Sequence, residues 1–376
     1  MKFKDLPYER VVYEEAEKEY HKIMEEFKAA GSGEEQFQVH KKYYALRNRM
    51  DTMITIARIR FDIDTTDEFY GKEIEHYDTI EPKLANLAVA YKKMMYESPY
   101  RDYLEGKIGK VAFKNMELEL KAFDEKLIPL MQEENALKTR YDKLIAGAKI
   151  EWEGDTLNLS LLRPYLTSND REVRRKAYGK YSAFFASWAE ELDEIYDKLV
   201  KNRTKQAKEM GYKDYVELGY YRMGRNCYDR DMVENYRKQV KESFVPFAEK
   251  LHEGRRQRLG LEKLSYIDES VYFLDGNPAP TGTPEEIMQA GQKMYSEMSA
   301  ETKEFFDFML DKELFDVLGR KTKKAGGYMT TLPEYGAPFI FANFNGTSGD
   351  VDVITHECGH AFQGYLAAKD PIQEHW

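Results

Sequence analysis

Residues 337–365 read APFIFANFNGTSGDVDVITHECGHAFQGY. Within this segment, the aromatic-rich run Phe339–Phe344 is typical of a strand. Residues 346–350, GTSGD, then supply residues that cap a helix, and the apolar residues after them recur at three- and four-residue spacings until Pro371. We therefore expect a strand that is followed almost directly by an amphipathic helix.

The expected helix carries the candidate catalytic residues His356, Glu357 and His360. Histidines four residues apart lie on one helical face, one turn apart, where both can reach a single tetrahedral Zn²⁺ at about 2.0 to 2.1 Å. Glu357 is rotated by about 100° from His356, so it can face the open position of the metal without binding it. The pattern predicts one zinc ion per chain, which acidifies a bound water while Glu357 accepts its proton and later passes it to the departing amine.

A pattern of three fixed positions also arises by chance, but its place on a capped helix after a strand-like segment is the arrangement that a zincin requires. Gly359 leaves the histidine face free of a side chain. Cys358 lies about 200° around the helix from His356 and is expected to pack in the core and not to bind metal. We expect the other histidines on long charged helices to be surface or hydrogen-bonded structural residues, namely His21, His40, His76 and His252.

The rest of the chain has mainly helical periodicity. Residues 149–159, KIEWEGDTLNL, change to the pattern of a β-hairpin, and Tyr266–Leu274 resembles a short strand before a Pro- and Gly-rich connection. We therefore expect a mainly α fold with small β-elements. Its predicted regions are an N-terminal helical region (residues 1–148), a β-hairpin and central helical region (residues 149–275), and a catalytic region with the strand and the HExxH helix (residues 276–376).

Composition excludes several classes of function. The formal net charge of −10 argues against nonspecific binding of nucleic acid, and no apolar stretch approaches the roughly 18 residues of a membrane-spanning helix. The N-terminal sequence lacks the features of a secretory signal, so a cytoplasmic location is expected. With only Cys227 and Cys358, the chain has no disulfide framework, and reduced thiols are expected.

Three segments carry a resemblance to a known family: residues 2–10 (KFKDLPYER), residues 196–225 (YDKLVKNRTKQAKEMGYKDYVELGYYRMGR) and residues 337–365. Over its whole length the chain resembles the oligoendopeptidase F branch of the thimet oligopeptidase family of zinc metallopeptidases. The resemblance implies a mainly helical, two-lobed enzyme of the zincin type. Small β-elements would line a deep channel that admits unstructured peptides and excludes folded proteins.

By this resemblance, His356 and His360 match the zinc ligands and Glu357 matches the catalytic glutamate. The Phe339–Phe344 segment matches a strand whose exposed edge pairs with the substrate backbone, and the run from Gly326 to Tyr328 resembles a flexible loop beside the channel. The substrate-binding residues implied in this way are Phe339, Ile340, Phe341, Ala342, Asn343, Gly327 and Tyr328.

One part of the family pattern is not matched. Members place a third zinc ligand, a glutamate, about 25 residues after the second histidine, which would lie beyond Trp376. Glu374 and His375 lie too close to His360 to match, and Leu366 occupies the position where metzincins have a third histidine. We therefore expect that these 376 residues belong to a longer enzyme and hold an incomplete metal site.

The leading hypothesis is a zinc-dependent endopeptidase that hydrolyses internal bonds of short, unstructured oligopeptides, with short peptides as its only expected partners. The alternative is a non-catalytic, peptide-binding helical scaffold or an inactive fragment of such an enzyme. A structural zinc protein is a weaker alternative, because structural sites close all four positions and favour cysteine clusters. The presence of Glu357 favours the enzyme, since a scaffold would not need that carboxylate.

Overall fold

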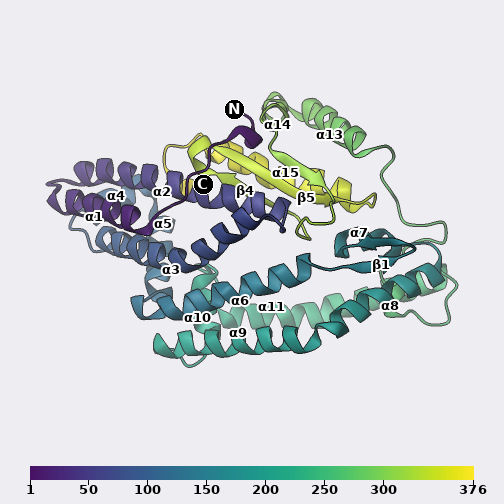
Figure 1. Ribbon diagram of the computed structural model, residues 1–376. Helices are drawn as coiled ribbons and strands as arrows, with labels where there is room; N and C mark the ends of the chain where they lie inside the picture. The colour runs from purple at the N-terminus through teal and green to yellow at the C-terminus, as the bar shows by residue number, and fades with distance from the viewer.

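A computed structural model describes all of residues 1–376 and confirms a mainly helical fold with small β-elements (Figure 1). The N-terminal third consists of helices only. Its long helices pack side by side, and the polar side chains of Ser32 and Asp67 cap the N-termini of two of them. These helices are α1 (Tyr13–Ala29), α2 (Gly33–Ile63), α3 (Glu68–Tyr96), α4 (Arg101–Ile108), α5 (Lys110–Ala122) and α6 (Ile128–Ala146).

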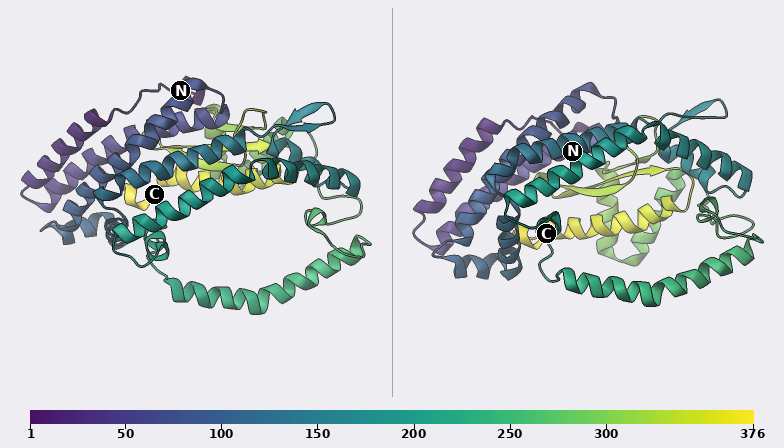
Figure 2. Two further views of the ribbon diagram at one scale, coloured as in Figure 1. Left: turned by 60° about the horizontal axis from the view of Figure 1, so that its bottom comes forward. Right: turned by 90° about the horizontal axis from the view of Figure 1, so that it is seen from below.

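The predicted hairpin is confirmed as strands β1 (Ile150–Trp152) and β2 (Asp155–Leu157). Glu153 and Gly154 form its two-residue turn with φ angles of 51° and 92°, the left-handed conformation that a tight hairpin turn requires. A second group of helices follows: α7 (Leu159–Leu166), α8 (Arg171–Ser187), α9 (Ala189–Glu209), α10 (Tyr215–Arg222), α11 (Arg230–Gln239) and α12 (Val245–Arg258). A π-helical turn joins α11 to α12, and the resulting curved rod has no buried residue and stands apart from the other helices (Figure 2).

The predicted strand at Tyr266–Leu274 is wrong. Residues Tyr266–Asp268 form a 3₁₀ turn, because the Asp268 carboxylate accepts hydrogen bonds from both the backbone N–H and the hydroxyl of Ser265. That carboxylate also pairs with two arginines of α8, Arg171 and Arg174, about a hundred residues earlier in the chain. Local apolar pattern could not anticipate this long-range anchor.

The C-terminal third contains helices α13 (Pro284–Met298) and α14 (Ala300–Asp311), strands β3 (Phe315–Leu318), β4 (Tyr328–Leu332) and β5 (Ala337–Phe344), and helix α15 (Gly349–Ala367). The strands form a sheet in the order β3-β5-β4, with β5 parallel to β3 and antiparallel to β4. Strand β5 is therefore central and paired on both sides. The expectation that Phe339–Phe344 presents an exposed edge is wrong.

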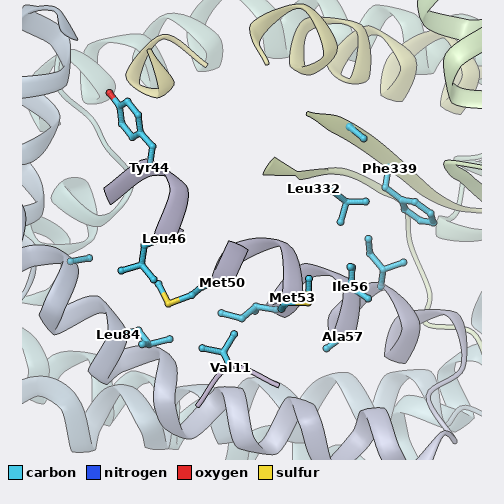
Figure 3. Close-up of a cluster of buried hydrophobic side chains, with 14 of the residues drawn as sticks. Val11, Tyr44, Leu46, Met50, Met53, Ile56, Ala57, Leu84, Leu332 and Phe339 are labelled. Carbon is cyan, nitrogen blue, oxygen red and sulfur yellow. The ribbon is translucent and has the colours of Figure 1, made fainter. Parts of the chain in front are cut away.

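Strand β5 is central because its sequence suits burial on both faces. Helix α15 packs against β5, and helix α2 packs against the neighbouring β4. Figure 3 shows Met53 and Ile56 of α2 beside Leu332 and Phe339 of the sheet. The Phe339 ring also contacts Phe3, at a centroid distance of 4.3 Å, so the N-terminal segment closes the same core. A strand with apolar residues at successive positions, rather than alternate ones, satisfies both faces at once.

One hydrophobic core joins the N-terminal helices to the β3-β5-β4 sheet and to α13–α15. A separate, smaller core around Trp152 and Leu162 holds the hairpin to α7 and α8. The predicted regions 1–148 and 276–376 thus share one core, while their boundaries stay a prediction. No helix combines the length and apolar character needed to cross a membrane.

A fully buried lysine stabilises the sheet where its register breaks. The β3–β5 pairing shifts between Asp316 and Leu318, which leaves carbonyl groups without ladder partners. The Lys323 ammonium group donates to the carbonyl oxygens of Asp316 (2.9 Å), Leu318 (3.1 Å) and Ala342, and it pairs with the Asp316 carboxylate. Burial lowers the pKa of Lys323 to about 8.

This lysine should make stability depend on pH in the alkaline range. Its folded pKa lies below the unfolded value of about 10.4, so between these two pH values the unfolded chain binds the extra proton and stability rises with pH. Between pH 7.5 and pH 9.5, we expect the free energy of unfolding of the parent to rise by about 1 to 2 kcal/mol relative to that of Lys323→Met, which lacks the titrating group. Urea denaturation at both pH values measures it. A difference that stays constant with pH would contradict the assignment.

A glycine sets the distance between α13 and the catalytic helix. A Cβ atom added at Gly291 would lie 2.8 Å from Ile354 Cγ2 and 3.3 Å from Phe306 Cζ. The helices therefore approach more closely here than a larger residue allows.

We expect Gly291→Ala to destabilise the protein, because overpacking costs about 1 to 3 kcal/mol and exceeds the gain of up to about 1 kcal/mol in helix propensity. The matched control is Gly179→Ala in α8, where an added Cβ meets no atom within 4 Å. This control should be neutral or slightly stabilising. Equal urea midpoints for the two variants would show that the α13–α15 contact is not tight.

Candidate metal and peptide site

Helix α15 begins with a buried carboxylate. Asp350 accepts hydrogen bonds from the backbone N–H groups of Asn345 (3.0 Å) and Gly346 (2.8 Å), while Ser348, at the N-cap position, makes no side-chain cap. The predicted side-chain capping of the helix by residues 346–350 is therefore wrong, and Asp350 instead reaches back from the first turn to bind the loop. Burial raises the pKa of Asp350. The loop between β5 and α15 is therefore held in one conformation, which fixes the position of the helix.

One face of α15 is anchored in the core through Ile354, Cys358 and Ala361. The hydroxyl group of Tyr295 on α13 donates to the Ile354 carbonyl oxygen at 3.0 Å. Cys358 is fully buried, and burial raises the pKa of its thiol to about 12. The expectation that Cys358 packs in the core is confirmed.

The opposite face of α15 exposes both histidines. The Nε2 atoms of His356 and His360 lie 3.3 Å apart, and the two rings are inclined at 84°. Two ligands of a tetrahedral zinc ion at about 2.0 to 2.1 Å are themselves about 3.3 Å apart, so this pair fits such an ion. Gly359 lies between them, and an added Cβ there would meet no atom within 4 Å. The face around the histidines is open.

No third side chain that could bind zinc lies together with His356 and His360. No group of three or more His, Cys, Asp or Glu side chains forms a potential metal cluster. The Glu374 carboxylate is hydrogen-bonded to His40 (2.9 Å) and to the hydroxyl of Tyr44, and His375 lies 2.9 Å from the Asp370 carboxylate. The sequence analysis excluded Glu374 and His375 as ligands, and the structure places both in other contacts.

The remaining histidines have the predicted structural or surface character. His40 is buried, and its other ring nitrogen lies 3.0 Å from the hydroxyl of Tyr91. His76 is hydrogen-bonded to the Val11 carbonyl oxygen at 2.9 Å, while His21 and His252 are exposed.

Strand β4 lies at one of the two edges of the sheet, its outer edge is free, and the sequence pattern did not predict it as a strand. The backbone N–H of Ile340 donates to Leu314 on the β3 side, so Ile340 and its partner Met329 form a non-hydrogen-bonded pair of the β4–β5 ladder. The pair of Thr331 and Pro338, two residues along, has the same character, consistent with a proline that has no N–H to donate. The backbone groups of Met329 and Thr331 are therefore directed away from β5, to the free edge.

This edge lies beside the catalytic helix. A Cβ added at Gly364 of α15 would contact Thr331 at 3.4 Å and Met329 at 3.8 Å. Because β4 and α15 are both antiparallel to β5, they run in the same direction, with the start of β4 toward the histidines. The edge and the two imidazoles therefore border one open strip of surface.

The substrate-binding residues proposed from sequence lie in different environments, and three of them, Gly327, Ala342 and Asn343, line one cavity. Gly326 and Gly327 are exposed at the entry to β4, as expected of residues beside a channel. Tyr328 stacks on Phe341 with ring centroids 4.9 Å apart and donates its hydroxyl hydrogen to Asp62, so its side chain faces the core. Asn343 donates to the carbonyl oxygens of Lys324 and Gly326 and shapes the glycine loop. The other proposed residues, Phe339, Ile340, Phe341 and Ala342, are buried in the central strand.

A cavity of about 910 Å³ opens where the start of β4 meets the N-terminus of α15. Its walls come from α7, α8, the segment 266–279 and the loop between β5 and α15. On the side of α15 it is lined by Asp352 and Val353, which lie one helical turn before His356. The cavity thus lies next to the start of β4 and one helical turn before the candidate metal ligands, and neither histidine lines it.

Comparisons with known proteins agree with this arrangement. Residues 3–123 match the peptidase M3 N-terminal domain, and residues 165–374 match peptidase family M3. The chain is similar over its whole length to two crystal structures described as oligoendopeptidase F, one of them from Bacillus anthracis, each at 44% identity and a TM-score of 0.98, and it covers 67% and 69% of their lengths. It is also similar to PZ peptidase A bound to an inhibitor, at 45% identity and a TM-score of 0.98, and covers 67% of that chain. A comparison with curated proteins found no match.

Proposed function

Because the chain belongs to peptidase family M3, a family of metallopeptidases, we propose that it acts as a zinc-dependent endopeptidase on short, unstructured peptides. The observation that carries the proposal is the convergence of the His356 and His360 Nε2 atoms to 3.3 Å on the exposed face of α15, with Glu357 between them in sequence. These three residues have the chemistry and spacing of a zincin motif.

His356 and His360 would hold the zinc ion, one per chain, through their Nε2 atoms. A zinc ion bound there supplies a water molecule of lowered pKa and polarises the scissile carbonyl group. Zinc prefers at least three protein ligands in a catalytic site. Since no third donor faces the histidines, we propose that a glutamate outside residues 1–376 completes the site. The chain covers 67% and 69% of the two oligoendopeptidase F structures, so those proteins contain further residues that could include such a glutamate.

Glu357 would be the general base and then the general acid. It is half-buried beside the exposed histidine face and follows His356 directly, so its carboxylate can reach the proton of an attacking water without binding the metal itself. The same carboxylate can then deliver that proton to the departing amine. The helix holds the carboxylate in place because the adjacent residues Cys358 and Ala361 are fixed in the core.

Strand β4 would bind the peptide backbone by strand addition. The outward N–H and C=O groups of Met329 and Thr331 can pair with an extended peptide, and only an unfolded segment has its own backbone groups free for this. Folded proteins would be refused, because unfolding a domain costs about 5 to 15 kcal/mol. A non-catalytic peptide-binding protein would need the same edge but not the carboxylate of Glu357, and this difference separates the two hypotheses.

The first test is Glu357→Gln in an active form that includes the third ligand. Loss of the proton acceptor should lower kcat by about 10²- to 10⁴-fold while the zinc content stays at the parental level. Peptide cleavage and metal analysis of the same sample measure both. The control His356→Ala should lose zinc as well as activity. Near-parental turnover by Glu357→Gln would remove this residue from the mechanism.

The second test is Thr331→Pro, which removes one outward N–H from the free edge. The hydrogen bonds between β4 and β5 should survive, because Thr331 and Pro338 form a non-hydrogen-bonded pair and the ladder does not use the N–H of Thr331. We expect KM to rise about five- to tenfold, the loss of about one hydrogen bond, with little change in the urea midpoint. Thr331→Ala keeps the N–H and should keep the parental KM. If both variants have the parental KM, the peptide does not pair with β4.

A further inference from the structure

The cavity beside the α15 N-terminus has a wall of tyrosines. Tyr178 and Tyr181 project from α8, and Tyr266 and Tyr272 come from the segment 266–279. Tyr266 packs edge-to-face on Tyr178, with ring centroids 5.0 Å apart and planes inclined at 68°. Tyr266 nevertheless remains 62% exposed and Tyr272 45% exposed. Exposed rings that gather around a cavity mark a place where apolar groups bind.

Buried ion pairs hold this wall in place. The Asp268 carboxylate is fully buried and accepts hydrogen bonds from Arg171 (2.8 and 3.0 Å) and Arg174 (2.9 Å), and these arginines lower its pKa. The Arg174 guanidinium also donates to the Ile267 carbonyl oxygen at 2.9 Å. Farther along, the Asn169 side chain donates to the Asp275 carbonyl oxygen at 2.8 Å. Rings on a fixed backbone lose little conformational entropy when a ligand binds.

The cavity lies in line with the proposed path of the peptide. It is lined by Gly326 and Gly327 at the start of β4, and by Asp352, four residues and about 6 Å along the helix before His356. A peptide that adds to β4 in the antiparallel sense runs with its carboxyl end toward Gly327. At about 3.4 Å per residue, its second or third residue after the scissile bond reaches the cavity.

We propose that the tyrosine-walled cavity is a specificity subsite for an aromatic side chain of the peptide, two to three residues on the carboxyl side of the cut. The proposal rests on the proposed function for its position relative to the scissile bond. The recognition itself depends only on the tyrosines. A ring that enters the cavity can pack edge-to-face against Tyr266 and Tyr178, in the geometry these two rings already adopt with each other.

Peptide binding tests the subsite without catalysis. Labelled, unstructured heptapeptides of alanine, serine and glycine with one variable position, occupied by Phe, Lys or Ala, are titrated with the 376-residue chain in the presence of a chelator, and fluorescence anisotropy gives Kd. We expect the Phe peptide to bind about tenfold more tightly than the Ala peptide, as for burial of one aromatic ring. Equal Kd values, tighter binding of the Lys peptide or no measurable binding of the Phe peptide would overturn the proposal.

Variants of the cavity tyrosines test whether these residues cause the preference for the Phe peptide. Tyr266→Ala should reduce the Phe-to-Ala preference to about twofold or less, and Tyr178→Leu, which preserves the packing of α8, should reduce it as well. Tyr196→Ala on α9 is the matched control, since that ring is 72% exposed and does not line the cavity. It should leave the preference unchanged. A preference that survives both cavity variants would overturn the assignment.

Cleavage of the Phe peptide tests where the aromatic residue lies relative to the cut. It requires an active form that includes the third ligand. Mass spectrometry of the products should place Phe as the second or third residue after the cut. Phe on the amino side of the cut would overturn the position in the proposal. If no peptide is cleaved although the binding preference depends on Tyr266, the proposed peptidase function fails and the aromatic subsite stands.

Discussion

The double-sided burial of strand β5 is the constraint on which the other features depend. Its residues from Ala337 to Ala342 are all buried, and both edges of the strand are paired, so its backbone has no free edge, and only its end, at Ala342 and Asn343, lines the cavity. Helix α15 can follow β5 after a short loop only if it turns back along one face of the sheet, while α2 occupies the other side at β4. The N-terminal helices thus support the strand that positions the catalytic helix, although some 300 residues separate them in sequence.

This arrangement divides α15 into two faces with opposite requirements. The face with Ile354, Cys358 and Ala361 is apolar and fixed by the core, whereas the face with His356 and His360 is exposed, as the proposed binding of metal and peptide requires. A residue that acts in proton transfer needs a stable position to within a fraction of an ångström. Glu357 lies at the boundary between the two faces, where the backbone is held by packing and the carboxylate still reaches the surface.

Features that depend on local periodicity were accessible from the sequence. The histidine spacing, the inward position of Cys358, the β1–β2 hairpin and the strand-to-helix transition near residue 346 each follow from a few neighbouring residues. The order of the sheet was not accessible, because pairing depends on which strands long-range packing brings together. Strand β4 has a short YMTTL sequence after two glycines and was not predicted as a strand, and the family resemblance implied an exposed edge on the more hydrophobic β5. Hydrophobicity identifies the buried strand of a sheet, and for that reason it points away from the edge that can bind a peptide.

The irregular segments around the site raise a different physical problem. Their backbone groups cannot pair within helices or strands, and a buried unpaired group is costly. In this chain, buried charges satisfy them: Lys323 binds three carbonyl groups at the sheet break, Asp350 binds two N–H groups before α15, and Arg174 binds carbonyl groups near Asp268. Each lies beside a segment that lines the cavity, Asp350 lines it directly, and none is a candidate metal ligand. Loss of one partner would leave an uncompensated charge, and at Lys323 this charge would affect the core as well as the loop, because its ammonium group lies 4.4 Å from the centroid of the buried Phe341 ring. The geometry of the site therefore depends on these buried ionic contacts as well as on the apolar packing around β5.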